Sequence, residues 1–360
     1  MQYKFLIYIS YSYAVPIGLP LEKEILKQGY TVKWFADIDE GKKAIQSKKN
    51  SLQTIEEALD YNPDIILAAT DSVPDFFEGL KVQIFHGFNA EKRPTKKDTF
   101  AHFRIRGFFD LYCTQGPSTT KGFKAQQQKQ PCFEVIETGW SKVDPLFPIE
   151  KKEISNTIMI ASTFTERLSL AYNDAVYHKI KHLSSIGAFN FIMVLHPKLP
   201  KHIVDKWKSI TNKNFTFYNT TDLVPLYKKA DLMFADTTSA IQEFLLQKKP
   251  VVAFNHTFNH NYLIHTQNAN QIEAAFHKAL NYSEELVKNI EQYINELHPY
   301  FDGKSSQRVI NASIDFLHQD KSYLKSKPLN LIRKYKMRKR LNYFTFKSFN
   351  KAYTRTKNNG

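Results

Sequence analysis

Stretches typical of strands alternate with helical segments along most of this 360-residue chain, and this alternation limits the possible folds more than any other feature. In the first half the expected strands lie at 4–10, 30–36, 63–70, 81–86, 108–115 and 132–139. The same rhythm starts again after residue 150, with strands expected at 157–163, 190–197, 214–218, 231–238 and 250–255. Strands joined through helices form parallel sheets that are covered on both faces, so the sequence predicts two doubly wound α/β domains.

The boundary between the two domains is expected in the stretch 138–154, which contains two prolines and several charged residues. We therefore predict an N-terminal Rossmann-like domain over 1–145, a C-terminal one over 146–320 and a basic tail over 321–360. Two such domains joined by a linker would place a deep cleft between them. Neither half contains a G-x-G-x-x-G or a G-x-x-x-x-G-K-[ST] motif, so the common dinucleotide and P-loop sites lack support.

Composition points to a reducing compartment, because the chain has only two cysteines, Cys113 and Cys132. The first residues, MQYKFLIYIS, predict a strand rather than a signal peptide. No run approaches the roughly 18 uninterrupted apolar residues that a membrane span needs. We therefore expect a cytoplasmic protein.

The positive charge of the chain is concentrated towards its C-terminal end. Residues 321–360 contain 13 of the 50 Lys and Arg residues and none of the 35 acidic ones, so the rest of the chain is nearly neutral. Large apolar side chains interrupt these charges at Tyr335, Leu341, Tyr343, Phe344, Phe346 and Phe349. Such a segment can bind an anionic membrane surface, follow a nucleic-acid backbone or stay solvated. A specific nucleic-acid binder usually has a basic face on its folded domain, so a nearly neutral body disfavours that alternative.

The stretch KVQIFHG, residues 81–87, ends an expected strand on a histidine that a glycine follows. In open parallel sheets the carboxyl ends of the strands face the ligand crevice. His86 is therefore a candidate general base, although a histidine with a structural role gives the same pattern. Gly87 would let the backbone turn away without placing a side chain in the crevice.

Two stretches of the second half also end expected strands on polar residues. ADTTSA, residues 235–240, places Asp236, Thr237, Thr238 and Ser239 before a helix, where free N–H groups and hydroxyls converge. This turn is a candidate diphosphate site, and an ordinary helix N-cap is the alternative. FIMVLHP, residues 191–197, ends on His196, a second strand-terminal histidine that would face the same cleft and can hold phosphate when charged.

In order and in residues, several of these stretches resemble the CDP-glycerol glycerophosphotransferases, which build poly(polyol phosphate) chains of the teichoic-acid type. The resemblance covers residues 80–312 and rests on FHGFNAEKR, TGWSKVDPLF, LHPKL, ADTTSAIQEF and FDGKSSQRVI. It implies a GT-B fold, in which two Rossmann-like domains face a central cleft and the second holds most of the nucleotide. Members of this family are often peripheral membrane proteins, which would suit the basic tail.

The resemblance also implies roles for individual residues. His86 would be the base that activates the acceptor hydroxyl, and Gly87, Lys92 and Arg93 would contact the acceptor or a phosphate. The implied donor diphosphate and nucleotide contacts are Arg167, His196, Asp236, Thr237, Thr238 and Ser239. This sequence departs from the family twice: Lys92 follows the histidine by six residues rather than five, and ASTFTER replaces Pro-Thr-Trp-Arg, with an arginine only at Arg167.

The expected reaction transfers glycerol phosphate, or another polyol phosphate, from a CDP-activated donor to an acceptor hydroxyl and releases CMP. Expected partners are a CDP-polyol, a lipid-linked or polymer acceptor and the inner face of the cell membrane, and neither a cofactor nor nucleic acid is expected. The stretch SAIQEF also resembles UDP-N-acetylglucosamine 2-epimerases, so a GT-B sugar-nucleotide enzyme stays open, as does a non-catalytic nucleic-acid binder. His256, His260 and His265 have a metal-like spacing but no Cys or acidic neighbour, so a polar loop is expected instead of a metal site.

Overall fold

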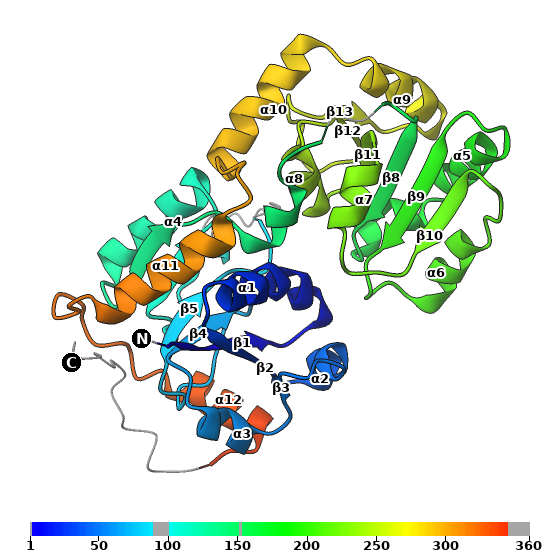
Figure 1. Cartoon of the computed structure of the whole chain (residues 1–360). Coiled ribbons are helices and arrows are strands. Elements are labelled where there is room, and N and C mark those ends of the chain that lie inside the picture. Colours follow the sequence, from blue (N-terminus) through cyan, green and yellow to red (C-terminus); the bar gives the residue numbers. More distant parts are fainter. Residues whose placement is uncertain (1, 89–100, 151–152, 345–360) are drawn as a thin grey trace. The chain divides into compact units, whose positions relative to one another are not determined.

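A computed structural model of the protein describes residues 2–88, 101–150 and 153–344, which fall into two compact units (Figure 1). Within that part of the chain, the first unit comprises residues 2–87, 101–147 and 297–344, and the second comprises the remainder. Each unit is built on its own parallel sheet, which confirms the prediction of two doubly wound α/β domains.

The first unit contains a seven-stranded parallel sheet with the strand order β3-β2-β1-β4-β5-β6-β7. Its strands are Lys4–Ile9 (β1), Thr31–Ala36 (β2), Ser51–Leu52 (β3), Ile65–Ala68 (β4), Leu80–Gln83 (β5), Leu111–Thr114 (β6) and Glu134–Glu137 (β7). Its helices are Val15–Lys27 (α1), Asp39–Ile45 (α2), Ile55–Tyr61 (α3), Pro117–Lys129 (α4), Ser305–His318 (α11) and Leu331–Leu341 (α12). Residues 5–9 of β1 are all buried, as expected of an interior strand whose two faces are covered.

The second unit contains a six-stranded parallel sheet with the order β10-β9-β8-β11-β12-β13. Its strands are Thr157–Ser162 (β8), Asn190–Leu195 (β9), Phe215–Tyr218 (β10), Leu232–Ala235 (β11), Val251–Phe254 (β12) and Ile264–Thr266 (β13). Its helices are Asp174–Ser185 (α5), Lys201–Lys208 (α6), Val224–Lys229 (α7), Ala240–Leu245 (α8), Ile272–Leu280 (α9) and Glu284–Leu297 (α10). In each sheet the strand order reverses beside the first strand, β1 or β8, and ligands of doubly wound sheets bind at the carboxyl edge near that reversal.

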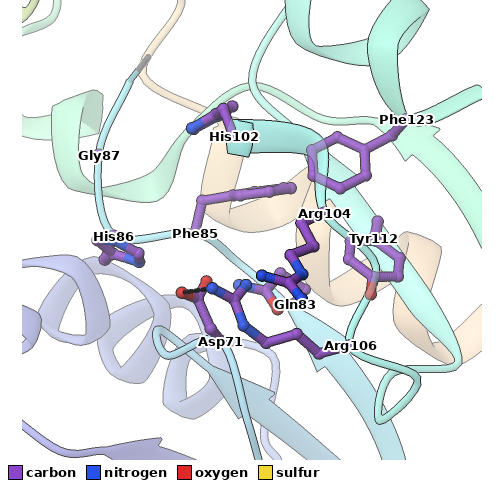
Figure 2. A pocket seen from close by; sticks show the side chains of 10 residues that line it. All are labelled: Asp71, Gln83, Phe85, His86, Gly87, His102, Arg104, Arg106, Tyr112 and Phe123. Atoms are coloured by element: carbon purple, nitrogen blue, oxygen red, sulfur yellow. Dashed lines mark ion pairs between the residues drawn. The ribbon is translucent and has the colours of Figure 1, made fainter. Parts of the chain in front are cut away.

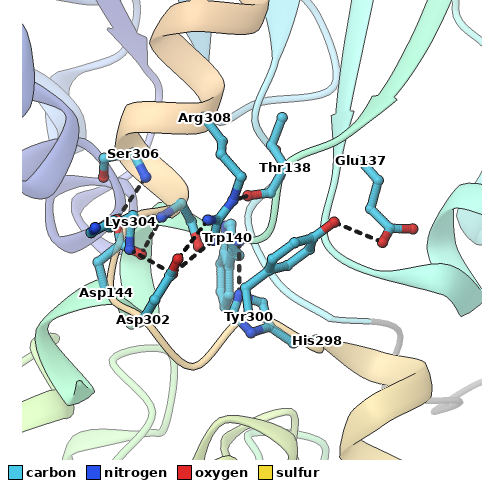
Figure 3. Close-up of polar contacts among 11 residues, drawn as sticks. Glu137, Thr138, Trp140, Asp144, His298, Tyr300, Asp302, Lys304, Ser306 and Arg308 are labelled. Atoms are coloured by element: carbon cyan, nitrogen blue, oxygen red, sulfur yellow. Dashed lines mark hydrogen bonds and ion pairs between the residues drawn. The ribbon is translucent and has the colours of Figure 1, made fainter. Parts of the chain in front are cut away.

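The units differ from the expected domain boundaries at their C-terminal side. The second unit ends at Glu296, so residues 297–320, which the sequence places in the second domain, lie in the first unit. The chain returns there through α11, whose N-terminal end contacts residues 138–147 (Figure 3). That stretch was predicted as a linker, but Ser141–Leu146 forms a largely buried 3-10 helix.

Two motifs that are far apart in the sequence meet at this chain return. The Asp144 carboxylate accepts the backbone N–H groups of Ser305 and Ser306 at 2.8 and 2.7 Å, which satisfies free donors in the first turn of α11. Arg308 Nε donates to the carbonyl oxygen of Thr138 at 2.9 Å. The TGWSKVD and FDGKSSQR motifs therefore stabilise the chain return of the first unit.

His298 lies at the same return and is fully buried. Its Nε2 accepts the backbone N–H of Trp140 at 3.0 Å, and burial lowers the pKa of its ring to about 4. An unfolded histidine titrates near pH 6.5, so protons bind the unfolded chain more readily, and the free energy of unfolding should fall as the pH drops from about 6.5 towards 4. In urea unfolding, His298→Gln should lose less stability over this window than the wild type. The same pH dependence in both proteins would contradict this prediction.

The segment predicted as a basic tail is docked on the first unit over its described part, residues 321–344, which we call the C-terminal strap. Three ion pairs join it to that unit: Lys327–Asp110 at 2.5 Å, Arg338–Asp75 at 2.8 Å and Arg340–Asp37 at 2.8 Å. Arg338 is fully buried, and its guanidinium lies 4.9 Å from the ring centroid of Phe76. These acidic partners precede their basic residues by 217 to 303 positions, so the sequence pattern alone suggested a separate tail.

Apolar residues of the C-terminal strap divide between the core and the surface. Leu341 and Tyr343 are partly buried against the hydrophobic core of the first unit, so each uses part of its surface within the protein. Tyr335 and Phe344 remain exposed. The other two expected membrane contacts lie outside the described residues; they are Phe346 and Phe349.

Candidate active site

His86 follows β5 at the carboxyl edge of the first sheet. The strand ends at Gln83, so the prediction that it extends to the histidine is wrong at that end. Phe85 takes a left-handed backbone conformation with φ 57°, which a bulky residue rarely adopts, while its ring is buried with the centroid 5.0 Å from that of Phe123. The left-handed turn is thus made by Phe85, and Gly87 has no positive φ. Burial of the Phe85 ring leaves the next side chain, His86, exposed.

A pocket of about 120 Å³ lies beside His86 (Figure 2). Its residues come from β5 and β6, from the loops after β4 and β5, from α4 and from the segment 102–106. They are Asp71, Gln83, Phe85, His86, Gly87, His102, Arg104, Arg106, Tyr112 and Phe123. The residue predicted as the base therefore borders a pocket whose other polar side chains the sequence analysis missed.

Two arginines make this pocket positively charged. Arg106 pairs with Asp71 at 2.9 Å, as the dashed line in Figure 2 shows. Arg104 makes no ion pair with any residue that the structure describes. In the sequence, these arginines are marked only by the alternation of charged and apolar residues in HFRIRG, residues 102–107. This pattern is too common to indicate a binding site.

Two neutral polar groups lie near His86. Burial lowers the pKa of His102 to about 4, so its ring is uncharged at neutral pH. Its Nε2 atom is buried and has no hydrogen-bond partner among the residues described. The ring of Tyr13 lies 6.1 Å from that of His86, and burial raises the pKa of Tyr13 to about 12, so the hydroxyl keeps its proton. Both groups supply hydrogen-bonding atoms and no charge.

In the second unit, His196 follows β9 at the carboxyl edge of the sheet. It is half-buried, and its Nδ1 accepts the backbone N–H of Lys198 at 3.1 Å. Its ring also lies 4.6 Å from that of Phe164, which follows β8. The hydrogen bond and the ring contact hold the imidazole beside the point where the strand order reverses.

Asp236, at the end of β11, is fully buried, and its carboxylate is engaged inside the protein. It accepts the hydroxyl of Ser162 at 2.5 Å and the backbone N–H groups of Thr163 and Leu170, each at 2.9 Å. These bonds join β11 to the segment after β8. The Asp236 carboxylate is thus buried, where it positions that segment, and is not exposed as a diphosphate contact would be.

The turn after β11 has one buried and two partly exposed hydroxyl residues. Thr237 is buried, and its Oγ1 lies 3.1 Å from that of Thr257. Thr238 and Ser239 are half-buried at the start of α8. Ser239 occupies the N-cap position but makes no side-chain cap hydrogen bond, whereas Thr238 Oγ1 accepts the backbone N–H of Ala240 at 3.4 Å. The helix-cap alternative therefore accounts for the hydroxyl of Thr238 and not for that of Ser239.

Three predicted site residues remain, together with the histidine-rich loop. Arg167 is exposed in a 3-10 turn, Glu166–Leu168, and Lys92 and Arg93 lie outside the described residues. In the histidine-rich loop, His265 Nε2 accepts the backbone N–H of His260 at 3.0 Å. Across the described ranges, no group of three or more His, Cys, Asp or Glu side chains is placed to hold a metal ion.

No protein-family model matches the sequence, and no curated protein matches it. A variant of the wall teichoic acid polymerase TagF matches the structure with a TM-score of 0.62 and 10% sequence identity, over 87% of this chain and 88% of that chain. The UDP-GlcNAc 2-epimerase of Neisseria meningitidis bound to UDP-GlcNAc matches with a TM-score of 0.57 and 16% sequence identity, over 87% of this chain and 100% of that chain. MnaA of S. aureus with UDP matches with a TM-score of 0.58 and 16% sequence identity, over 91% of this chain and 99% of that chain. These similarities show that the chain has the GT-B fold, as predicted.

Proposed function

We propose that the protein transfers glycerol phosphate, or another polyol phosphate, from a CDP-activated donor to an acceptor hydroxyl in the synthesis of a cell-surface polymer. The main support is the position of His86, an exposed histidine beside a positively charged pocket at the carboxyl edge of the first sheet. The motifs over residues 80–312 resemble those of CDP-glycerol glycerophosphotransferases, and the fold is shared with the polymerase TagF.

In this reaction His86 accepts the proton of the acceptor hydroxyl while the hydroxyl oxygen attacks the β-phosphorus of the donor. A new P–O bond forms the phosphodiester, and the bond between the β-phosphorus and the bridging oxygen breaks. CMP leaves with that oxygen and the bonding electron pair. Positioning and charge stabilisation supply most of the rate enhancement, and a positioned base adds about 10²–10⁴-fold.

Release of CMP from a panel of CDP-polyols tests the proposal. CDP-glycerol or CDP-ribitol should release CMP when an acceptor is present, and the difference between them identifies the polyol. UDP-sugars should not react. Conversion of UDP-GlcNAc into its 2-epimer without CMP release would instead establish a second candidate function, which the structural similarity to the N. meningitidis epimerase favours.

Loss of a hydroxyl from the turn after β11 should weaken donor binding. Thr238→Ala and Ser239→Ala are each expected to reduce CDP-glycerol binding by about 1–3 kcal/mol, because each removes a hydrogen bond to a charged diphosphate. His196→Ala should have a similar effect. Titration calorimetry measures this loss, with Thr216→Ala on the edge strand β10 as the matched control. Unchanged affinity in all three variants would leave the turn a purely structural connection.

We also propose that the exposed side of the C-terminal strap binds the anionic inner face of the cell membrane. No helix within the described residues is long and apolar enough to cross a membrane. The strap instead exposes large apolar side chains next to exposed Lys and Arg residues: Leu329, Leu331, Ile332, Tyr335 and Phe344 beside Arg333, Lys336 and Lys339. This combination is typical of segments that lie in the headgroup region of a bilayer.

Replacing Ile332 and Tyr335 together by serine should release the protein from anionic vesicles, because both side chains are more than half exposed. Deleting the strap would not test this, since Arg338 is part of the folded first unit. Co-sedimentation at two salt concentrations is the measurement, and binding should fall with salt because charges are screened beyond about 10 Å at 0.1 M. A control with Leu26 and Ile186 replaced by serine should bind normally. Equal binding by all three proteins would contradict the membrane proposal, and salt-sensitive binding to RNA alone would favour nucleic acid.

A further inference from the structure

One wall of the pocket beside His86 is formed by a segment that has little regular structure of its own. Residues 104–109, which bring Arg104 and Arg106 to the pocket (Figure 2), all lie in the described part of the chain and form no helix or strand. Their backbone makes no hydrogen bond to the backbone of any residue that the structure describes. The course of this segment therefore depends on side chains from elsewhere in the first unit.

Asn330, in the C-terminal strap, bonds the middle of this segment. Its Nδ2 donates to the carbonyl oxygen of Arg106 at 2.5 Å. The Asn330 backbone is left-handed, with φ 54°, a conformation that asparagine tolerates better than most residues. Its Oδ1 accepts a hydrogen bond from Arg333 Nη1 at 2.9 Å. Both ends of the amide are thus engaged, which keeps the N–H donor directed at the segment.

The residues just before Asn330 extend the same contact. Lys327 Nζ donates to the carbonyl oxygen of Phe108 at 3.0 Å. Between the two bonded carbonyls lies Gly107, with φ 75°, where an added Cβ would lie 2.9 Å from Cγ of Pro328. The strap therefore lies directly against the segment that forms the pocket wall.

The same part of the strap exposes large apolar side chains. Leu329, Leu331 and Ile332, which surround Asn330 in the sequence, are all more than half exposed. We propose that Asn330 is a positioning residue for the pocket beside His86, and that an anionic membrane surface bound to these side chains raises the rate of transfer through it. This regulation rests on the proposed function, because it acts on the same site.

Membrane binding and the order of the pocket are linked because both involve the strap. A membrane that takes up Leu329 and Ile332 immobilises the backbone at Asn330, which lies between them. The other end of the segment is held separately, since Phe103 packs on Phe123 with the ring centroids 5.3 Å apart. With both ends held, the segment loses less conformational entropy when the reactants bind, so the reaction becomes faster.

Asn330→Gly tests the positioning role, because glycine keeps the left-handed backbone and removes the amide. Amide hydrogen exchange of residues 104–109 should become faster in this variant. With CDP-glycerol as the donor and glycerol as a soluble acceptor, kcat/KM for the acceptor should fall about two- to ten-fold, as expected for one lost hydrogen bond. The affinity for the donor should not change. Asn330→Asp keeps the size of the side chain but lacks the N–H donor, so it should behave in the same way.

Asn342→Gly is the matched control. Asn342 also has a left-handed backbone, with φ 51°, but it lies at the other end of α12 and is exposed. This variant should have the exchange rates and the kcat/KM of the wild type.

Vesicles of phosphatidylglycerol test the membrane regulation, with vesicles of phosphatidylcholine as the neutral control. The anionic vesicles should raise kcat/KM of the wild type and slow the exchange of residues 104–109, and the neutral ones should do neither. Because glycerol stays in solution, such a gain cannot come from a membrane that concentrates the acceptor. Asn330→Gly should still co-sediment with the anionic vesicles, but without a gain in rate.

Equal exchange and equal rates in Asn330→Gly and Asn342→Gly, with both variants folded, would overturn the positioning role. Anionic vesicles that leave the wild-type rate unchanged, or that accelerate Asn330→Gly as much as the wild type, would overturn the membrane regulation. If exchange responds to Asn330→Gly but no CDP-polyol releases CMP, the proposed function fails and the positioning of the segment stands.

Discussion

Replacing His86 by alanine is expected to lower the rate of CMP release from CDP-glycerol by about 10²–10⁴-fold, the contribution of a positioned general base. The affinity for the donor should not change, because the residues proposed to bind it lie in the second unit and His86 acts on the acceptor. The side chain is exposed, so its loss should alter the free energy of unfolding by less than about 0.5 kcal/mol. Steady-state kinetics and titration calorimetry with CDP-glycerol measure the two effects separately.

His202→Ala, which removes an exposed histidine from α6, is the matched control and should turn over at the wild-type rate. If His86→Ala did so as well, the histidine would be structural and the mechanism wrong. A variant that lost donor affinity and turnover together would instead move His86 to the donor side of the reaction.

Replacing Arg338 by alanine should cost about 3–5 kcal/mol of stability, because it leaves a buried carboxylate without its counter-ion. Arg338 is fully buried, and the side chain of its partner Asp75 is only 10% exposed. The variant also loses the contact of the guanidinium with the ring of Phe76. Urea unfolding of the full chain measures the effect as a lower midpoint concentration of urea. The loss of stability should be confined to the unfolding of the first unit.

Lys336→Ala is the control, two residues earlier on α12, where the side chain is exposed and a change within about 0.5 kcal/mol is expected. A double variant, Arg338→Met with Asp75→Leu, should recover much of the lost stability, because apolar replacements of a buried ion pair are often neutral. If Arg338→Ala and Lys336→Ala were equally stable, the C-terminal strap would contribute nothing to the folded first unit.

Both sheets could be predicted from the sequence because their strands are local features. The buried run over residues 5–9 and residues 158–161 of β8 are continuous apolar stretches, which is how strands covered on both faces appear in a sequence. β13 was missed because its three residues, Ile264–Thr266, are too few to show a period. Helix α5 begins only at Asp174, because two short 3-10 turns, Glu166–Leu168 and Leu170–Tyr172, occupy the positions before it.

The fold was harder to predict where charged residues are buried by partners distant in the sequence. Asp144 and Arg308 lie in polar stretches that look solvated, and only their contacts across the chain return show that they are structural. The candidate site shows the same limit. His86 could be found from the end of its strand, whereas Arg104 and Arg106 reach the pocket because Phe103 packs on α4 and Asn330 bonds the backbone nearby.

The first unit is interrupted in the sequence, because most of the second unit, residues 148–296, lies between its segments. On the ribosome, all strands of its sheet are therefore made before the basic residues that neutralise Asp75 and Asp37, which follow 263 and 303 residues later. At about 5–20 residues per second, the nascent chain spends roughly 10–60 s with these carboxylates lacking their partners. Synthesis of the second unit is completed within that interval. The first unit is therefore begun first and completed last. Translation speed and chaperone access over this interval should therefore affect the yield of folded protein more through the first unit than through the second.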